Sequence, residues 1–360
     1  MAHNPNPIET KKSGVNWKQV GLFVGLTIAL SWLIDLVLVL KFGYGQYAVV
    51  FFQLQMLIPA FVAILLQRTV FKDSPLHMRT YRGRPRWFLN FYLFFTLLVA
   101  ALVILITLRP DLYPVPLAGL LMPILVISLI VLLATRIASG KEAFQQAGLS
   151  GGKWTSWLLV WLAVMGFNCL NVALNMVAGF GSKSDIGPMA AAAGMDIPTY
   201  LIVGFVNTVV VGPLLGLVIA FGEEYGWRGY LQGELTKLGR IKGVLLVGVI
   251  WGIWHAPAVV MGHNYPGHPV LGPIAFLVFN LILSILLGYI MLKTGSVWQV
   301  AFAHAIINQG YQWLTIMVYA PTDPLFAFGV GLYGIAIAFL ISLVVLRDRI
   351  WKQANRSSTA

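Results

Sequence analysis

Three polar clusters interrupt apolar segments in the second half of this 360-residue chain. They contain seven side chains able to do acid–base chemistry or to direct hydrogen bonds: Glu223, Glu224, Arg228, Trp251, His255, His304 and Asn308. Ionisable groups at membrane depth are rare and costly, so they mark functional sites by default. A carboxylate, two imidazoles and a carboxamide could activate a water and stabilise an oxyanion, which predicts a centre for amide hydrolysis.

The spacing of the first cluster assigns different roles to its two carboxylates. Residues four apart share one face of a helix, while neighbours differ by about 100°. Glu224 and Arg228 are therefore expected to pair, and a buried arginine would neutralise that carboxylate and fix its rotamer. Glu223 points elsewhere. It is the free carboxylate and the predicted general base.

The other two clusters supply groups around that base. His304 and Asn308 are also four apart, so both face one point and can donate hydrogen bonds to a developing oxyanion. His255 could orient a water beside Glu223. Trp251 lies one turn earlier on the same helix face and would form a wall of the cavity.

The composition is that of a polytopic membrane protein. Hydrophobic residues make up 59% of the chain and charged residues 10%, with a mean hydropathy of +0.82, which predicts an all-α bundle of transmembrane helices. The net charge of +12 fits basic loops beside an anionic leaflet, and a nucleic-acid role is not needed to explain it. The single cysteine, Cys169, excludes an intramolecular disulfide and a cysteine-based metal site.

A helix needs roughly 20 apolar residues to cross a bilayer, and ten such segments are expected. They cover residues 20–40, 48–66, 88–108, 117–135, 155–178, 199–221, 243–262, 271–292, 296–318 and 327–346. The first is longer than a signal-peptide core and is interpreted as a retained anchor. Of the 24 lysines and arginines, all but Lys41, Arg109 and Lys183 then fall on one side, Arg228 counting as a loop residue. The positive-inside rule places that side, with both termini, in the cytoplasm.

The clusters divide the chain into three parts. Residues 1–198 form an N-terminal transmembrane region of unknown role with about five spans, residues 199–318 a catalytic core, and residues 319–360 the last span and a cytoplasmic tail. Glycine pairs with small-xxx-small spacing, among them Gly222 and Gly226, predict close helix packing in the core.

Several other polar residues have structural interpretations. Asp35 is expected to pair with Ser31 one turn back or to line a cavity. Asn168, Asn171 and Asn175 form a stripe that fits hydrogen bonding between helices. His263 and His268, in an outer loop, are expected to be solvated and offer too few ligands for a metal site.

The three clusters resemble the motifs of the CPBP family, the CAAX prenyl protease 2 and bacteriocin-processing intramembrane endopeptidases, also called the Abi family. The family pattern of EExxxR, an aromatic-xxx-His and HxxxN is met in order over roughly residues 200–310, with Trp251 where phenylalanine is usual. The resemblance implies an intramembrane endopeptidase in which Glu223 activates a water and His255 helps to hold it. It also implies that His304 and Asn308 stabilise the oxyanion, and that Glu224 and Arg228 organise the site.

The resemblance favours a metal-free mechanism without a cofactor, a peptide or protein substrate, lipidated or not, and a place in a bacterial plasma membrane. Zinc held by Glu223, His255 and His304 remains open, although the chain lacks an HExxH motif. A secondary transporter and a non-catalytic membrane protein of the bacteriocin-immunity type also remain open. The sequence carries no information on the oligomeric state.

Overall fold

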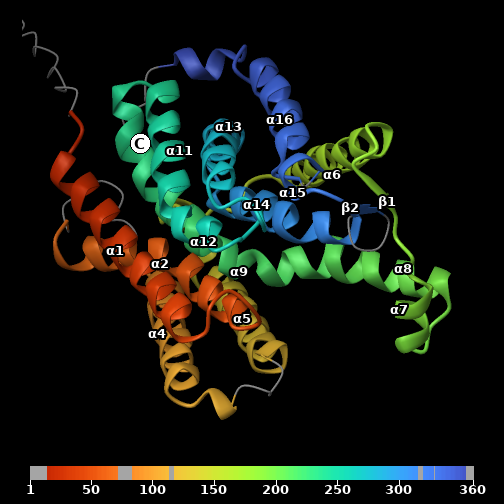
Figure 1. Cartoon of the computed structure of the whole chain (residues 1–360). Helices are drawn as coiled ribbons and strands as arrows, with labels where there is room; N and C mark the ends of the chain where they lie inside the picture. The colour runs from red at the N-terminus through yellow and green to blue at the C-terminus, as the bar shows by residue number, and fades with distance from the viewer. Residues whose placement is uncertain (1–13, 72–82, 113–116, 315–318, 328, 354–360) are drawn as a thin grey trace, which may run out of the picture.

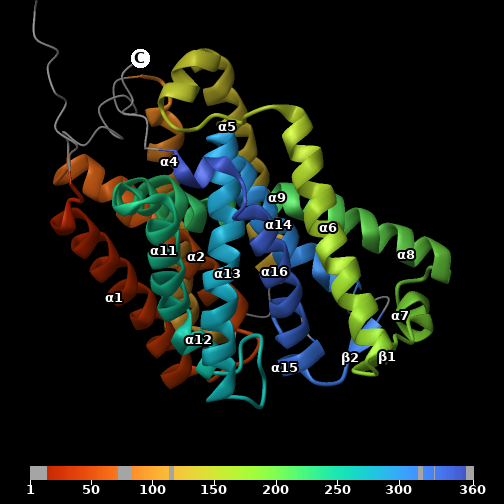
Figure 2. The same ribbon diagram turned by 90° about the horizontal axis from the view of Figure 1, so that it is seen from above.

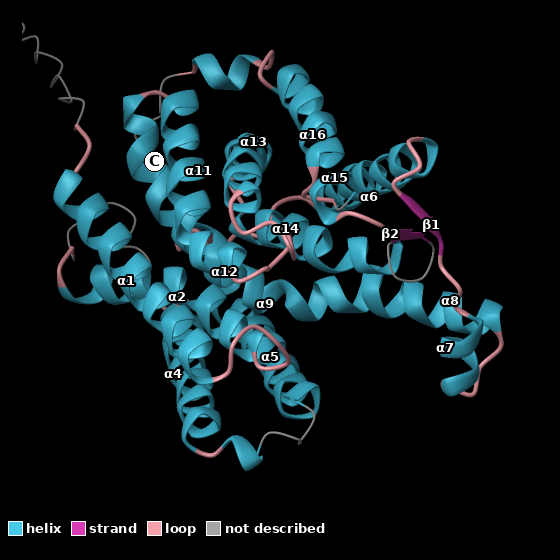
Figure 3. Cartoon of the chain, viewed as in Figure 1, coloured by secondary structure: helices cyan, strands magenta, loops and turns pink. Residues whose placement is uncertain are grey.

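The computed structural model describes residues 14–71, 83–112, 117–314, 319–327 and 329–353. The described chain is almost entirely helical (Figures 1 and 3), as expected for a polytopic all-α bundle. Among the described residues, seven helices are long and apolar enough to cross a membrane. The protein is therefore a multi-pass membrane protein with a helical fold.

The first half of the chain contributes five long helices. They are α1 (Trp17–Lys41), α2 (Ala48–Thr69), α4 (Arg86–Leu108), α5 (Leu117–Gln146) and α6 (Trp154–Val177). A short 3-10 helix, Pro110–Leu112, follows α4. Gly140 interrupts α5 with a φ of 78°, a left-handed conformation that favours glycine, and the helix kinks there.

The second half begins with α7 (Gly187–Ala192) and continues into one long helical stretch, Ile197–Leu238. Its parts are α8 (Ile197–Phe205), a π-helical turn (Val206–Val211), α9 (Gly212–Glu224), a second π-helical turn (Tyr225–Leu231), α10 (Gln232–Leu235) and a 3-10 turn (Thr236–Leu238). The remaining helices are α11 (Arg240–Trp254), α12 (Ala256–Val260), α13 (Leu271–Thr294), α14 (Val297–Gln312), α15 (Pro324–Ala327), α16 (Leu332–Val345) and a 3-10 turn (Arg349–Lys352). Two short strands, β1 (Gly181–Lys183) and β2 (Tyr319–Pro321), pair in antiparallel fashion.

Figure 1 shows α9 running beside α14, with α2 on its other side, and both neighbours contact α9 directly. Seen from above, α1, α11, α13, α16 and α6 follow one another in a row (Figure 2), each in contact with the next. The three motif segments therefore come from neighbouring helices.

Each of the ten predicted apolar segments overlaps a helix, although residues 315–318 of the segment 296–318 and residue 328 of the segment 327–346 lie outside the described chain. The number of spans stays a prediction. Helices α11, α14 and α16 have 15, 16 and 14 residues, fewer than the roughly 20 that a straight span needs. The sidedness of the termini also stays a prediction, because residues 1–13 and 354–360 lie outside the described chain.

The helix that carries the predicted span 199–221 does not end at residue 221, and the end of the span itself stays a prediction. Helical structure continues for 42 residues to Leu238, because no residue between Glu223 and Leu238 breaks the helix and Gly239, with a φ of 114°, ends it. The first cluster thus lies inside a long helix, and the π-helical turn that follows Glu224 is a feature often found at functional sites. Counting Arg228 among the loop cations was also wrong, since its side chain is completely buried.

The predicted close packing at Gly222 and Gly226 is confirmed. A methyl group on Gly222 would lie 2.9 Å from the Cα of Leu57 and would also meet the backbone oxygen of Met56, and one on Gly226 would lie 2.8 Å from the carbonyl carbon of Pro59. Small residues let helix backbones approach closely in membranes. This approach brings α2 against the part of α9 that carries Glu223.

We expect Gly222→Val to lower the free energy of unfolding by about 1–3 kcal/mol, because the added side chain would push α2 away from α9. Thermal unfolding of the purified protein in detergent would measure this. The matched control is Gly25→Ala in α1, where a methyl group meets no atom within 4 Å and should leave stability unchanged or slightly raised. Equal effects of the two substitutions would contradict the packing argument.

One other structural interpretation needs correction. Asp35 does not pair with Ser31: its Oδ2 accepts a hydrogen bond from Gln55 Nε2 at 2.9 Å. Ser31 Oγ instead accepts one from Trp254 Nε1 at 2.7 Å. Helical spacing favoured the i,i+4 partner, whereas the close packing of α1 against α2 and α11 supplies partners from other helices.

The asparagine stripe on α6 is confirmed at Asn171, which bonds to a residue outside the helix, whereas the bond between Asn175 and Asn171 lies within α6. Asn171 Nδ2 donates to the backbone oxygen of Gly329 at 3.2 Å, and Asn175 Nδ2 donates to Asn171 Oδ1 at 2.7 Å. Asn168 differs, because its side chain lines a cavity.

Candidate active site

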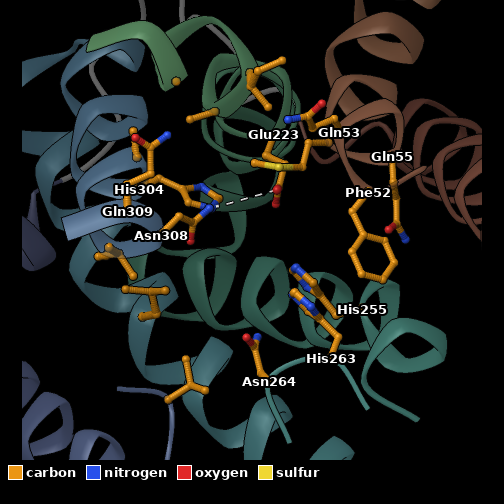
Figure 4. A pocket seen from close by; sticks show the side chains of 18 of the residues that line it. Phe52, Gln53, Gln55, Glu223, His255, His263, Asn264, His304, Asn308 and Gln309 are labelled. Atoms are coloured by element: carbon orange, nitrogen blue, oxygen red, sulfur yellow. Dashed lines mark ion pairs between the residues drawn. The ribbon is translucent and has the colours of Figure 1, made fainter. Parts of the chain in front are cut away.

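Glu223 lies near the middle of the long helix, and its side chain is buried. Its Oε2 accepts a hydrogen bond from Trp251 Nε1 at 2.7 Å. Its Oε1 lies 3.9 Å from His304 Nε2 (Figure 4). These two atoms are too far apart for a direct hydrogen bond and close enough for one water to contact both.

Glu224 contacts the same imidazole through its other nitrogen and holds two partners through one oxygen. Its Oε1 accepts hydrogen bonds from Arg228 Nη1 at 3.1 Å and from His304 Nδ1 at 2.7 Å. The predicted pair with Arg228 is thus confirmed, with both side chains completely buried. The contact with His304 was not predicted, because 80 residues separate the two positions and helical spacing carries no information over that distance.

Arg228 also connects the pair to the second motif. Its guanidinium carbon lies 4.2 Å from the centre of the Trp251 ring, within the range of a cation–π interaction. Trp251 therefore contacts Arg228 through its face and Glu223 through its indole N–H. Trp251 also lines a cavity, where it was expected to lie, and its indole N–H holds one oxygen of the Glu223 carboxylate.

The hydrogen-bond partners indicate the tautomers of the two imidazoles. His304 Nδ1 faces the Glu224 carboxylate and His255 Nδ1 faces the backbone oxygen of Trp251 at 2.9 Å, so both nitrogens donate. In the neutral ring Nε2 then accepts. His304 Nε2 can donate to an oxyanion only when the ring is an imidazolium, a condition that the sequence prediction for His304 did not include.

A cavity of about 670 Å³ brings the motifs together. Among the residues that line it are Glu223, Trp251, His255, His304 and Asn308. Glu224 and Arg228 are not among its lining residues; both lie buried behind the wall. All four predicted reacting side chains thus line one cavity. The two charged supporting residues, Glu224 and Arg228, lie next to it.

His255 occupies a different part of this space. In Figure 4 it lies beside His263, apart from Glu223 and His304. Its ring centre is 5.5 Å from that of Trp251, and no hydrogen bond joins the side chains of His255 and Glu223, both within the described chain. Its predicted part in holding the water at Glu223 stays a prediction.

His263 is half-buried, not freely solvated as predicted. The loop after α12 folds back, so that the ring packs edge-on against Phe52 with centres 4.8 Å apart and lines the cavity. Burial lowers the pKa of His263 to about 4, and the ring is neutral at pH 7. His268 is not simply solvated either, because its Nε2 lies 3.2 Å from Asp323 Oδ1.

Sequence reasoning missed several polar side chains that complete the cavity. They are Gln53 and Gln55 of α2, Asn264 of the loop, Asn280 of α13 and Gln309 of α14. The signal available was the presence of amides within apolar segments, such as the two glutamines of α2. Asparagine and glutamine also form ordinary hydrogen bonds between membrane helices. Their presence in apolar segments therefore did not distinguish cavity-lining residues from structural ones.

The side chains named for zinc do not fit a metal ion in this arrangement. Both imidazoles have Nδ1 bonded to an oxygen, as metal-ligating histidines usually do. Among the residues that the structure describes, however, no three His, Cys, Asp or Glu side chains converge closely enough to hold one ion. The cofactor requirement stays a prediction.

Comparison with known proteins identifies the same part of the chain. Residues 205–310 match the family model described as type II CAAX prenyl endopeptidase Rce1-like. A protein of Methanococcus maripaludis named CAAX prenyl protease 2 is 29% identical over 107 residues, which are 28% of this chain and 39% of that relative. The chain thus covers well under half of the relative's length. The matches confirm the resemblance to the CPBP family that the three motifs predicted.

Proposed function

We propose that this protein is an intramembrane endopeptidase that hydrolyses peptide bonds with a water activated by Glu223. One observation carries the proposal: Glu223, His304 and Asn308, from two helices far apart in the sequence, line one cavity of about 670 Å³. The match of residues 205–310 to the Rce1-like family and the relative named CAAX prenyl protease 2 support the same class of reaction.

The proposed reaction begins at the carboxylate. Glu223 takes a proton from a water as the water oxygen attacks the carbonyl carbon of the scissile bond, and the carbonyl oxygen becomes an oxyanion. The amide N–H of Asn308, with N–H from the imidazolium form of His304, stabilises that oxyanion. The C–N bond then breaks as Glu223 returns the proton to the leaving amine, leaving a carboxylic acid and an amine.

Contacts with neighbouring side chains support the proposal that the Glu223 carboxylate is held in the orientation needed to activate a water. The Trp251 indole occupies one carboxylate oxygen at 2.7 Å, so the other oxygen is directed toward the side of His304. Glu224 keeps Nδ1 of His304 engaged, which orients Nε2 toward Glu223. Fixed groups of this kind lower the reorganisation required in the transition state.

The substrate in this proposal is a peptide or protein segment, lipidated or not, that reaches the site within the bilayer. The proposal includes a bacterial plasma membrane as the location and both termini in the cytoplasm. The transporter and immunity-type alternatives are not supported by a specific contact of the described residues.

The test uses protein purified in detergent and a panel of peptides, with products identified by mass spectrometry. Internal cleavage that depends on Glu223 is the expected result. Substrate counterflow in liposomes without cleavage would instead favour a transporter, and neither activity would favour the non-catalytic alternative.

We expect chelators to leave the cleavage rate within about twofold of the untreated enzyme, because water activation is assigned to a carboxylate and the described ligands do not converge on an ion. The measurement compares initial rates before and after dialysis against EDTA and after addition of zinc. Complete inhibition that zinc reverses would contradict the metal-free mechanism and assign Glu223 and the imidazoles as ligands.

A further inference from the structure

The cavity lies toward one end of the helix bundle, away from an end marked by basic residues. Arg68 is in the last turn of α2, Lys293 is in the last turn of α13, and Arg240 begins α11. These three residues define what we call the basic end. The cavity-lining residues of α2 fall within Val49–Met56, in the half of the helix remote from Arg68, and those of α11 fall in its last turn. The cavity therefore approaches the opposite end of the bundle.

Dense packing separates the cavity from the basic end. Every residue of the long helix from Glu224 to Gln232 is buried except Gly229. Trp298, at the start of α14, stacks on Phe221 with ring centres 4.4 Å apart, and both side chains are buried. Interiors packed in this way leave few voids that admit even a water molecule. A substrate that approached Glu223 from the basic end would have to cross this layer.

The loop after α12 covers the cavity at the opposite end. This loop, Gly262–Val270, places His263 and Asn264 against the cavity (Figure 4), whereas its Pro266 and Gly267 are exposed. Helices α12 and α15 lie at this same end, at the bottom of Figure 2. The loop therefore has one side on the cavity and the other on the surface of the molecule.

Two polar contacts join the loop to the segment that leads into α16. The Tyr265 hydroxyl donates to the backbone oxygen of Val330, and the Tyr265 side chain is buried. Further along the loop, His268 Nε2 lies 3.2 Å from Asp323 Oδ1, and these two side chains are 27% and 35% exposed. Exposed pairs of this kind contribute little to stability. The part of the loop near His268 is thus held more weakly than the part that Tyr265 anchors.

We propose that substrates enter the cavity from the end opposite the basic residues, where the loop separates from Asp323. This inference rests on the proposed function, because it concerns what reaches Glu223, and it adds the class of substrate. The basic residues are predicted to face the cytoplasm. The substrates are then segments of proteins exposed on the outer face of the membrane, and not chain ends in the cytoplasm.

The first test measures access to the cavity without requiring catalysis. In a Cys169→Ser background, Met56→Cys places a thiol in the cavity, Lys183→Cys one on the predicted outer side and Lys242→Cys one at the basic end. Sealed right-side-out membrane vesicles are treated with a charged maleimide that does not cross the bilayer. We expect Met56→Cys to react as Lys183→Cys does, and Lys242→Cys to react only after detergent is added. Reaction of Met56→Cys only from the side of Lys242→Cys, or from neither side, would overturn the inference.

The second test measures the side on which cleavage occurs. A charged, water-soluble peptide that the purified protein cleaves is added outside right-side-out vesicles and, separately, outside inside-out vesicles. Because a charged peptide does not cross the hydrocarbon core, we expect cleavage at least about tenfold faster in the right-side-out vesicles. Detergent should abolish the difference, and the Glu223→Gln protein provides the background rate. Faster cleavage in the inside-out vesicles would contradict the proposed route.

The third test holds the loop closed. His268→Cys and Asp323→Cys are combined in the Cys169→Ser background and joined by a short bifunctional thiosulfonate. We expect cross-linking to lower the cleavage rate at least about tenfold, since a fixed loop blocks entry, and a reducing agent to restore it. The matched control joins Arg109→Cys to Asp111→Cys, an exposed pair that does not line the cavity. An unchanged rate after complete cross-linking of the loop would exclude it as the entrance.

The outcomes for this route and for the proposed hydrolysis are separable. If Met56→Cys reacts from the outer side and no peptide is cleaved under any condition, the endopeptidase is refuted and the access route stands. If peptides are cleaved only from the basic side, the endopeptidase stands and the access route is refuted.

Discussion

Replacement of Glu223 by glutamine is expected to lower kcat for peptide cleavage by about 10²–10⁴-fold, the usual contribution of a positioned general base. Glutamine has nearly the same shape and can still accept the Trp251 indole N–H through its amide oxygen. It cannot take a proton from water at neutral pH. Steady-state cleavage of a peptide by purified variant and wild type, with thermal unfolding of both, would measure the effect.

The matched control for this substitution is Glu234→Gln on the same long helix. Glu234 forms an ion pair with Lys237 at 2.7 Å and does not line the cavity, so kcat should stay within twofold of wild type. If Glu223→Gln kept more than a third of wild-type activity, the base would have to be another group. The nearest such group is Glu224, whose Oε2 has no hydrogen-bond partner in the described chain.

The contacts that could be predicted from the sequence are those made within one helix. The pairing of Glu224 with Arg228 followed from a spacing of four residues and is present at 3.1 Å. The same rule failed for Asp35, which had a suitable Ser31 one turn away and instead pairs with Gln55 of another helix. Local spacing shows which contacts are possible, and packing between helices decides which of them form.

Contacts between helices needed the family resemblance or the structure. The motif order implied that Glu223, His255, His304 and Asn308 share a site, and they do line one cavity. The shared use of one Glu224 oxygen by Arg228 and His304 could not be inferred from spacing, because it depends on how α14 packs on α9.

The length of the long helix shows a limit of hydropathy. Apolar residues stop near Phe221, and a span was therefore predicted to end there, but the helix continues to Leu238. Buried polar groups that pair with one another do not require the helix to leave the protein interior. Hydropathy reports the average polarity of a segment. It does not show that the charges of Glu224 and Arg228 compensate each other and so allow both residues to be buried.

The partnership of these two residues leads to the second large expected effect. Glu224→Gln is expected to lower the free energy of unfolding by about 3 kcal/mol, because it leaves the buried Arg228 charge without its counter-charge. Both side chains are completely inaccessible to solvent, and Nε and Nη2 of Arg228 have no other hydrogen-bond partner in the described structure. Thermal unfolding in detergent at constant pH would measure the loss, and kcat should fall as well because His304 Nδ1 loses a charged acceptor.

A double-mutant cycle separates the lost pairing from other consequences of the Glu224 substitution. Arg228→Met removes the charge that Glu224→Gln leaves uncompensated, so the double variant should be more stable than Glu224→Gln alone, although it would not regain kcat. Asp111→Asn is the matched control for an ion pair: Asp111 contacts Arg109 at 2.7 Å on the exposed surface, where such pairs contribute little, and its unfolding should not change measurably. If Glu224→Gln melted with the wild type, Arg228 would have to be compensated by another group, and its interaction with the face of Trp251 at 4.2 Å would be the first to test.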